Sequence, residues 1–197
     1  FTDIIINVHH FADQIYEFVL KYKGPARLSV SDERKQLLDT GGGLFNASWF
    51  FHTDEDFLVY NTDILCDLNL LTLYGNHLKN KPLATLAVRN RPTSRYLLFN
   101  KNDMLCGWEN KKTNEKIQTR KSSIIQPFAF SGIQVISPKI FKIFHPDKAV
   151  FSITNMYLEL SKKEHIRAFV DTSNYWSDVG KPEELHEASK NLDNFLI

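Results

Sequence analysis

The first third of the chain alternates short apolar runs with helical patterns. Residues 4–8 are apolar enough for a buried strand, and residues 12–22 repeat apolar positions at the spacing of one helix face. Two further strands are predicted over 27–31 and 56–60, and a further helix over 68–78. Strands and helices that alternate in this way predict a parallel sheet with helices on both of its faces.

The second half of the chain predicts additional antiparallel strands. A turn at Asn102 and Asp103 separates the apolar runs 95–100 and 104–108, which indicates a hairpin. The lysine-rich segment 109–124 is expected to be an exposed connection. The remaining elements are strands over 83–90, 128–136 and 165–170 and helices over 153–162 and from Pro182 onward. We therefore expect a single domain that spans residues 1–197.

Composition narrows the classes of partner. Hydrophobic residues make up 43% of the 197 residues, too many for a disordered chain, and the net charge is only +1. This balance gives no global field for nucleic acid or for a membrane surface, so neither is expected as a partner. The two cysteines, Cys66 and Cys106, show no metal-site spacing and no disulfide framework. We expect reduced thiols and a cytoplasmic protein. A local cluster of basic side chains consists of Arg89, Arg91 and Arg95.

A glycine run provides the first candidate for ligand contact. Thr40, Gly41, Gly42 and Gly43 are predicted to form a turn that leads into a helix over 44–51. Glycines let the backbone approach a ligand closely, and free N–H groups at a helix start can bind phosphate or the edge of a base. A plain turn that requires positive φ is an equally good interpretation. The run is not a P-loop, because no Gly-Lys-Ser/Thr follows it.

Two carboxylates provide the second candidate. Asp63 closes the tripeptide 61–63 after one predicted strand, and Asp178 lies within 176–180 after another. Carboxylates at strand ends can hold Mg²⁺, which takes one or two protein carboxylates together with phosphate oxygens. The structural alternatives are a helix N-cap at Asp63 and ordinary turn chemistry at Asp178.

Five short motifs follow one another along nearly the whole chain. They are Asn7-Val8-His9-His10, Leu38-Asp39-Thr40-Gly41-Gly42-Gly43, Asn61-Thr62-Asp63, Phe130-Ser131-Gly132-Ile133 and Trp176-Ser177-Asp178-Val179-Gly180. In this order they resemble the sugar-1-phosphate nucleotidyltransferases, most closely the N-acetylmuramate-1-phosphate uridylyltransferase and mannose-1-phosphate guanylyltransferase-like groups. The resemblance implies a Rossmann-like α/β domain with a central mixed, mostly parallel sheet flanked by helices. It also implies a Mg²⁺-dependent reaction of a nucleoside triphosphate with a sugar 1-phosphate, which gives a nucleotide sugar and pyrophosphate.

The resemblance further implies roles for individual residues. Asp63 and Asp178 would be catalytic and would hold Mg²⁺ between them. Ser131 and Gly132 would border the sugar through backbone groups. The nucleotide, expected to be UTP or GTP, would contact Asn7, His9, Thr40, Gly41, Gly42, Gly43 and Asn61. The oligomeric state is left open, a homodimer included.

Several positions depart from the family pattern. Thr62 stands where many relatives have Gly before the metal-binding Asp, and the segment 115–117 only approximates their Glu-Lys-Pro. The glycine-rich loop with Arg and Pro-Lys that grips the triphosphate has no counterpart, nor has the first strand. We therefore expect an N-terminally truncated fragment that is inactive or barely active alone. His9 and His10 match no metal motif and are otherwise interpreted as loop or cap residues.

Two other functions fit the same sequence. The chain could be a regulatory domain that binds a nucleotide sugar without turnover, as related domains become when catalytic residues are lost. It could also belong to an enzyme whose acceptor is not a sugar, as in phosphocholine cytidylyltransferases. The residues upstream of Phe1 would discriminate, since a Gly-x-Gly-x-Arg loop followed by Pro-Lys there favours the sugar enzyme.

Overall fold

A computed structural model describes residues 1–51 and 53–190 and divides into two compact units. Unit 1 comprises Phe1–Asp54 and Pro138–Tyr157, and unit 2 comprises Glu55–Ser137 and Leu158–Ile197. The boundary falls within the helix α5 (Ile153–Leu160). Each unit has its own sheet, and the expectation of one domain over residues 1–197 stays a prediction.

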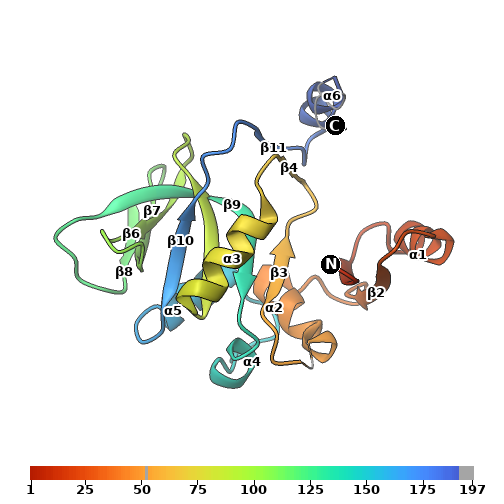
Figure 1. The fold of residues 1–197 in the computed structure, drawn as a ribbon, viewed down its shortest axis with the longest axis horizontal. Coiled ribbons are helices and arrows are strands. Elements are labelled where there is room, and N and C mark those ends of the chain that lie inside the picture. The colour runs from red at the N-terminus through yellow and green to blue at the C-terminus, as the bar shows by residue number, and fades with distance from the viewer. Residues whose placement is uncertain (52, 191–197) are drawn as a thin grey trace. The chain divides into compact units, whose positions relative to one another are not determined.

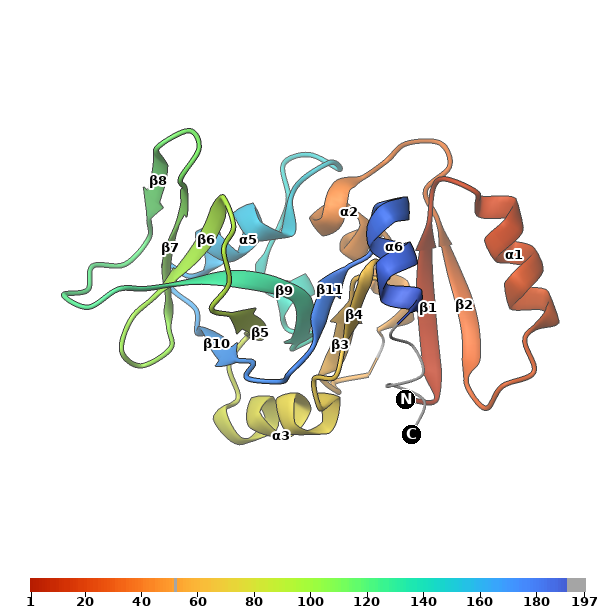
Figure 2. The ribbon, with the colours of Figure 1, turned by 90° about the horizontal axis from the view of Figure 1, so that it is seen from above.

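Unit 1 is built on a two-stranded parallel sheet. β1 (Asp3–Val8) pairs with β2 (Arg27–Asp32), and α1 (Ala12–Lys21) connects the two strands. Figure 2 shows α1 lying along β2, with which it is in contact. Parallel strands need a crossover connection, and a helix supplies it here. The strand, helix and strand predicted for this part of the sequence are therefore confirmed, but the burial predicted for the first strand is wrong, because only Val8 of β1 is buried.

Aromatic rings hold the rest of unit 1 together. Around Phe45, on α2 (Asp39–Asn46), three rings pack edge to face at centroid distances of 5.2 Å for Phe141, 5.7 Å for Phe144 and 5.5 Å for Phe151. Edge-to-face packing at this distance is favourable for aromatic pairs. These ring contacts hold the segment Pro138–Tyr157 of unit 1 against α2. Two short helices complete the unit, η1 (Ser48–Phe50) and α4 (Ile140–Ile143).

Unit 2 contains a seven-stranded mixed sheet with the order β10-β5-β9-β6-β7-β8, and β3 also pairs with β9 (Figure 1). Its strands are β3 (Phe57–Tyr60), β5 (Ala84–Arg89), β6 (Arg95–Phe99), β7 (Leu105–Asn110), β8 (Glu115–Gln118), β9 (Gln126–Ile136) and β10 (Ile166–Val170). The first residues of β9 pair with β6, and the later ones lie between β5 and β3. That later part of β9 is buried, as expected for the centre of a sheet.

A smaller sheet and two helices complete unit 2. β4 (Ile64–Cys66) pairs with β11 (Trp176–Asp178) in an antiparallel ladder. The helix α3 (Leu70–Asn80) packs on β5 and β9, and α6 (Pro182–Ser189) begins with the predicted proline in its first turn. Within the described part of the chain, no helix combines the length and apolar character needed to cross a bilayer.

The α/β class with a central sheet flanked by helices is confirmed, but three local predictions are wrong. The predicted glycine turn is the first half of α2, and the segment 109–124 contains the exposed strand β8. β3 pairs antiparallel with β9, and the large sheet has only one parallel pairing among its described strands, that of β10 with β5. Side-chain periodicity indicates that a segment is a strand, whereas its direction depends on the partner that hydrogen-bonds to it.

A buried histidine links α3 to the large sheet. His77 is fully buried, its Nδ1 shares a hydrogen bond of 2.8 Å with the hydroxyl of Thr85, and its Nε2 lies 3.4 Å from Oδ2 of Asp56. Burial lowers the pKa of His77 more than the carboxylate of Asp56 raises it. His77 is therefore held neutral in the core below the pH at which a free histidine is protonated.

This environment predicts a stability that falls with acidification. The unfolded chain takes up a proton at His77 near pH 6.5, about the ordinary value, while the folded chain does so only at lower pH. As the pH falls below about 6.5, the unfolded state binds more protons than the folded state. The free energy of unfolding therefore decreases, by at most about 1.4 kcal/mol per pH unit. Urea unfolding at pH 7.5 and 5.5 should show a larger loss for the wild type than for His77→Gln. The exposed His10→Gln variant is the control, and equal losses in all three proteins would contradict the prediction.

Candidate functional site

Asp63 and Asp178 lie side by side on paired segments of unit 2. The register of β4 and β11 sets Asp178 opposite Ile64, and the N–H of Val179 donates to the carbonyl of Asp63 at 2.7 Å. Both aspartates are exposed. Oδ1 of Asp178 and Oδ2 of Asp63 lie 3.1 and 3.6 Å from the point at which a Cβ on Gly180 would stand. The structure thus brings together the two carboxylates that the sequence singled out, and Gly180 leaves the space between them open.

A tight turn carries Asp63 beyond the end of β3. The N–H of Ile64 donates to the carbonyl of Asn61 at 3.1 Å, and the N–H of Asn61 donates to that of Gly132 at 2.9 Å. Gly132 has a φ of +79°, and a Cβ there would stand 2.9 Å from Cγ1 of Ile64. Only glycine fits this position without strain. The alternative of Asp63 as a helix cap is wrong, because Asn69 caps α3 by accepting from the N–H of Thr72.

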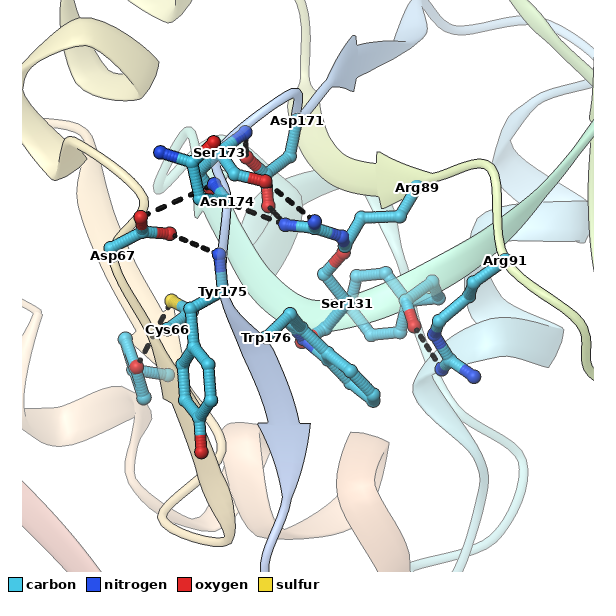
Figure 3. A network of polar contacts seen from close by, with 12 residues as sticks. Cys66, Asp67, Arg89, Arg91, Ser131, Asp171, Ser173, Asn174, Tyr175 and Trp176 are labelled. Atoms are coloured by element: carbon cyan, nitrogen blue, oxygen red, sulfur yellow. Dashed lines mark hydrogen bonds and ion pairs between the residues drawn. The ribbon is translucent and has the colours of Figure 1, made fainter. Parts of the chain in front are cut away.

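The backbone of β9 also holds Trp176. The indole N–H of Trp176 donates to the carbonyl of Ser131 at 2.9 Å (Figure 3). Ser131 is fully buried, and its hydroxyl has no hydrogen-bond partner among the residues that the structure describes. The carbonyl groups of Ser131 and Gly132 are therefore engaged in positioning Trp176 and Asn61. Direct contact of these two residues with a sugar stays a prediction.

Asp67 ties the segment that leads into β11 to the end of β4. Its carboxylate accepts the backbone N–H groups of Tyr175 at 2.9 Å and Asn174 at 3.2 Å (Figure 3). Burial raises the pKa of Asp67, but hydrogen bonds from Tyr175, Ser173 and Asn174 outweigh it, so the net pKa lies below the ordinary value. The charged form of Asp67 is favoured, and its hydrogen bonds hold the segment before β11 against the end of β4. The sequence did not single out Asp67, because its partners lie far along the chain.

Arg89 and Asp171 form a buried ion pair on the same side of unit 2. Nη1 of Arg89 lies 2.6 Å from Oδ2 of Asp171 and donates to the hydroxyl of Ser173 at 2.9 Å. The side chain of Asp171 is only 1% exposed. The pair anchors the start of the segment that Asp67 also holds. The basic cluster at Arg89 was visible in the sequence, but its acidic partner was not.

Unit 1 contains a second group of predicted residues, organised by a buried glutamate. Glu33 is 6% exposed, and its carboxylate accepts the side-chain N–H of Asn7 at 2.6 Å and the backbone N–H of Leu38 at 3.3 Å. Nδ1 of His9 lies 2.7 Å from the carbonyl of Glu33. A carbonyl only accepts, so Nδ1 of His9 carries the hydrogen, and Nε2 of the neutral ring is an acceptor. Sequence reasoning missed Glu33, because its burial depends on these tertiary contacts.

The N–H groups at the start of α2 are already used inside unit 1. The N–H groups of Gly41 and Gly42 both donate to the carbonyl of Phe151, at 2.9 and 3.1 Å. A Cβ on Gly41 would stand 2.8 Å from that oxygen, and one on Gly42 would stand 2.2 Å from the carbonyl oxygen of Ala149. These two glycines are therefore required for close packing of one segment on another. The predicted turn with free N–H groups is wrong.

Gly43 and Thr40 have separate surroundings. A Cβ on Gly43 would stand 2.7 Å from Oε1 of Glu33 and 2.8 Å from Nδ2 of Asn7. Gly43 thus makes room for the hydrogen bond between those two side chains. The hydroxyl of Thr40 accepts the N–H of Ile153 at 3.0 Å, at the start of α5.

The paired carboxylates of unit 2 suit Mg²⁺. Over residues 1–51 and 53–190, no group of three or more His, Cys, Asp or Glu side chains could hold a metal ion. A site for Mg²⁺ needs fewer, since this ion keeps several waters and takes one or two carboxylates plus substrate phosphates. Asp63 and Asp178 are exposed, of the right chemistry and separated by the open space at Gly180.

Curated relatives and solved structures match the chain. A bifunctional protein GlmU of Methanococcus aeolicus is 28% identical over 147 residues, which are 72% of this chain and 33% of that protein. A mannose-1-phosphate guanyltransferase of Yarrowia lipolytica is 25% identical over 193 residues, covering 93% of this chain and 49% of that protein. The chain therefore spans about a third to a half of the length of these relatives.

The fold is shared with a crystal structure of HddC from Yersinia pseudotuberculosis complexed with GMP-PN. The TM-score is 0.71 at 21% sequence identity, and the match covers 96% of this chain and 78% of that chain. The sequence profile described as "Nucleotidyl transferase" matches residues 1–194. Because this match spans almost the entire chain, the protein belongs to the nucleotidyl transferase family.

Proposed function

We propose that the protein transfers a nucleoside monophosphate from UTP or GTP to a sugar 1-phosphate, with release of pyrophosphate. The observation that carries this proposal is the convergence of Asp63 and Asp178 around the space that Gly180 leaves open. Membership of the family supports transfer of a nucleotide, and the names of the Yarrowia relative and of the complexed Yersinia structure support a sugar phosphate and a guanine nucleotide. We place the reaction in the cytoplasm and assign it to residues 1–197 as one domain.

The proposed roles follow from the chemistry of the transfer. Asp63 and Asp178 would hold Mg²⁺, and the ion would supply neutralisation of phosphate charge when bound. An oxygen of the sugar phosphate attacks the α-phosphorus of the nucleotide, the bond to the β-phosphate oxygen breaks, and pyrophosphate leaves. Little covalent chemistry falls to the protein in such a transfer, so its residues act by positioning and by electrostatic stabilisation.

Nucleotide contacts are assigned to the group organised by Glu33. The side-chain N–H of Asn7 donates to Glu33, which leaves the amide oxygen of Asn7 as one acceptor. Nε2 of His9 is the second acceptor. Two acceptors suit the N–H groups on the pairing edges of uracil and guanine. Gly43 adjoins this pair. The other assigned nucleotide residues are Thr40, Gly41, Gly42 and Asn61, of which Gly41 and Gly42 support packing.

Sugar contacts are assigned to the β9 backbone. Ser131 and Gly132 hold Trp176 and Asn61 in place, so the acceptor would meet a rigid edge beside Asp178. Rigid support of this kind favours productive geometry.

A direct assay tests the proposal. Pyrophosphate release by the intact parent protein is measured with each nucleoside triphosphate and a panel of sugar 1-phosphates, because residues 1–197 alone are expected to be barely active. Release with UTP or GTP and at least one sugar phosphate supports it. Binding of nucleotide sugars without pyrophosphate release under any combination points instead to a regulatory domain, and turnover only with a non-sugar phosphate points to another acceptor class.

Gly180→Ala tests the open space between the carboxylates. The added methyl group would stand 3.1 Å from Oδ1 of Asp178, tighter than most van der Waals contacts, and 3.6 Å from Oδ2 of Asp63. We expect the affinity for Mg²⁺ and kcat to fall about 10-fold or more, because small misplacements of reacting groups are costly. Gly75→Ala is the control, since a Cβ there meets nothing within 4 Å. Equal Mg²⁺ dependence of the two variants would show that the open space at Gly180 is not needed for Mg²⁺ binding.

A further inference from the structure

Arg91 occupies a fixed position on Trp176, two residues before Asp178, and is within reach of the charge of Asp178. Its guanidinium carbon lies 4.0 Å from the centre of the Trp176 ring, and its Nη2 donates to the carbonyl of Phe130 at 3.2 Å (Figure 3). Trp176 is itself fixed by its hydrogen bond to Ser131. Stacking and hydrogen bonding together hold the guanidinium plane in one orientation.

The charge of Arg91 lacks the compensation that Arg89 has. Arg89 forms an ion pair with Asp171, whereas no carboxylate in the described ranges 1–51 and 53–190 forms an ion pair with Arg91. Its Nε is buried and has no hydrogen-bond partner among those residues. Burial lowers the pKa of Arg91, and the negative charge of Asp178 opposes this effect. A guanidinium nevertheless stays protonated, so a partly buried positive charge is present without a close counterion.

We propose that Arg91 binds a phosphate group of a substrate next to Asp63 and Asp178. Of the five N–H donors of the guanidinium, one donates to the carbonyl of Phe130 and the others have no acceptor among residues 1–51 and 53–190, which leaves several for oxygens of an anion. The planar fork of arginine matches the geometry of a phosphate and forms charge-assisted hydrogen bonds with it. The proposal rests on the proposed function, which brings phosphates to this place.

Two substrates carry the required chemistry. The phosphate monoester of the sugar 1-phosphate is one, and the phosphates of the nucleotide are the other. In either case Arg91 would supply positive charge where the aspartates supply negative charge, so phosphate could approach without direct repulsion.

The experiment compares Arg91→Met, Arg91→Lys and Arg95→Met in the otherwise intact protein. Methionine keeps an unbranched apolar side chain against Trp176, lysine keeps the charge without the fork, and the exposed Arg95 provides the same loss of charge nearby. Binding of glucose 1-phosphate and of inorganic phosphate is followed by calorimetry and phosphorus NMR. KM is determined separately for the sugar phosphate and for the nucleoside triphosphate.

We expect Arg91→Met to weaken phosphate binding about 10- to 100-fold, in line with the loss of hydrogen bonds to a charged group. Arg91→Lys should be intermediate, and Arg95→Met should match the wild type. Binding of uridine and guanosine, which lack phosphate, should be unchanged in all variants. A purely structural role of Arg91 would instead disturb nucleoside binding and thermal stability together.

The separate KM values assign the source of the phosphate. A rise confined to the sugar 1-phosphate assigns Arg91 to the acceptor, and a rise confined to the nucleoside triphosphate assigns it to the nucleotide; both support the proposal. Arg91→Met that behaves like Arg95→Met in every binding assay overturns it. If the wild type releases no pyrophosphate but binds phosphate, and Arg91→Met weakens this binding, the proposed function fails and the phosphate site stands.

Discussion

Replacing Asp63 or Asp178 by Asn is expected to lower kcat by about 100-fold or more, the size seen when one group that stabilises transition-state charge is removed. Each substitution removes a negative charge from the proposed Mg²⁺ position and keeps the volume of the side chain. Both aspartates are exposed, so the free energy of unfolding should change by no more than about 0.5 kcal/mol. The hydrogen bond from the N–H of Gly180 to Oδ1 of Asp178 can be kept by the amide oxygen of Asn.

The measurement combines steady-state kinetics over a range of Mg²⁺ concentrations with urea unfolding. Asp67→Asn is the matched control, because it removes the same charge from an exposed aspartate just after β4. We expect this control to retain most of kcat and to lose up to about 1 kcal/mol of stability, since its carboxylate accepts two backbone N–H groups. Wild-type kcat in both Asp63→Asn and Asp178→Asn would remove these residues from the catalytic site.

Arg89→Met is expected to cost about 3–5 kcal/mol of stability, because it leaves the buried carboxylate of Asp171 without its counterion. It also removes hydrogen bonds to the hydroxyl and carbonyl of Ser173. Most proteins of this size have a total stability of only about 5–15 kcal/mol, so the loss is a large share. Urea unfolding at neutral pH measures the effect.

A second substitution separates the cost of an unpaired charge from the loss of packing. Replacing both partners of a buried ion pair by apolar side chains is often close to neutral. Arg89→Met combined with Asp171→Leu should therefore be more stable than Arg89→Met alone. Arg95→Met, at an exposed position, should change the free energy of unfolding by less than about 0.5 kcal/mol. If Arg89→Met is no less stable than Arg95→Met, the ion pair has no role in holding the segment before β11.

The elements that the sequence predicted correctly are those in which the local pattern of apolar residues indicates the type of element. α1 and α3 were found because the apolar positions follow the period of a helix that buries one face, and β1 was found from its short apolar run. The later part of β9 was found because apolar residues predominate in it, although Ser131, Gly132 and Gln134 interrupt them. The two aspartates were found because a carboxylate that follows an apolar strand is a local feature of the sequence.

The glycine run shows where local reasoning fails. Three consecutive glycines favour a turn by intrinsic propensity, because glycine is a poor helix former. In the structure Gly41 and Gly42 are helical, since the backbone of Ala149 and Phe151 comes too close for a side chain and accepts their N–H groups. Contacts from a distant part of the chain outweigh a preference of less than about 1 kcal/mol per residue.

The sequence by itself determined most of the longer strands and helices, the α/β class, and the two carboxylates around which the chemistry is proposed. Only the tertiary structure decided that β4 and β11 pair so that Asp63 and Asp178 adjoin, and that β3 runs antiparallel to β9. It also decided that Arg89 has a carboxylate partner, whereas Arg91 has none among the described residues. The physical reason is that burial of one face produces a periodic pattern of apolar residues along a short segment, whereas strand pairing and ion pairs join groups far apart in the sequence.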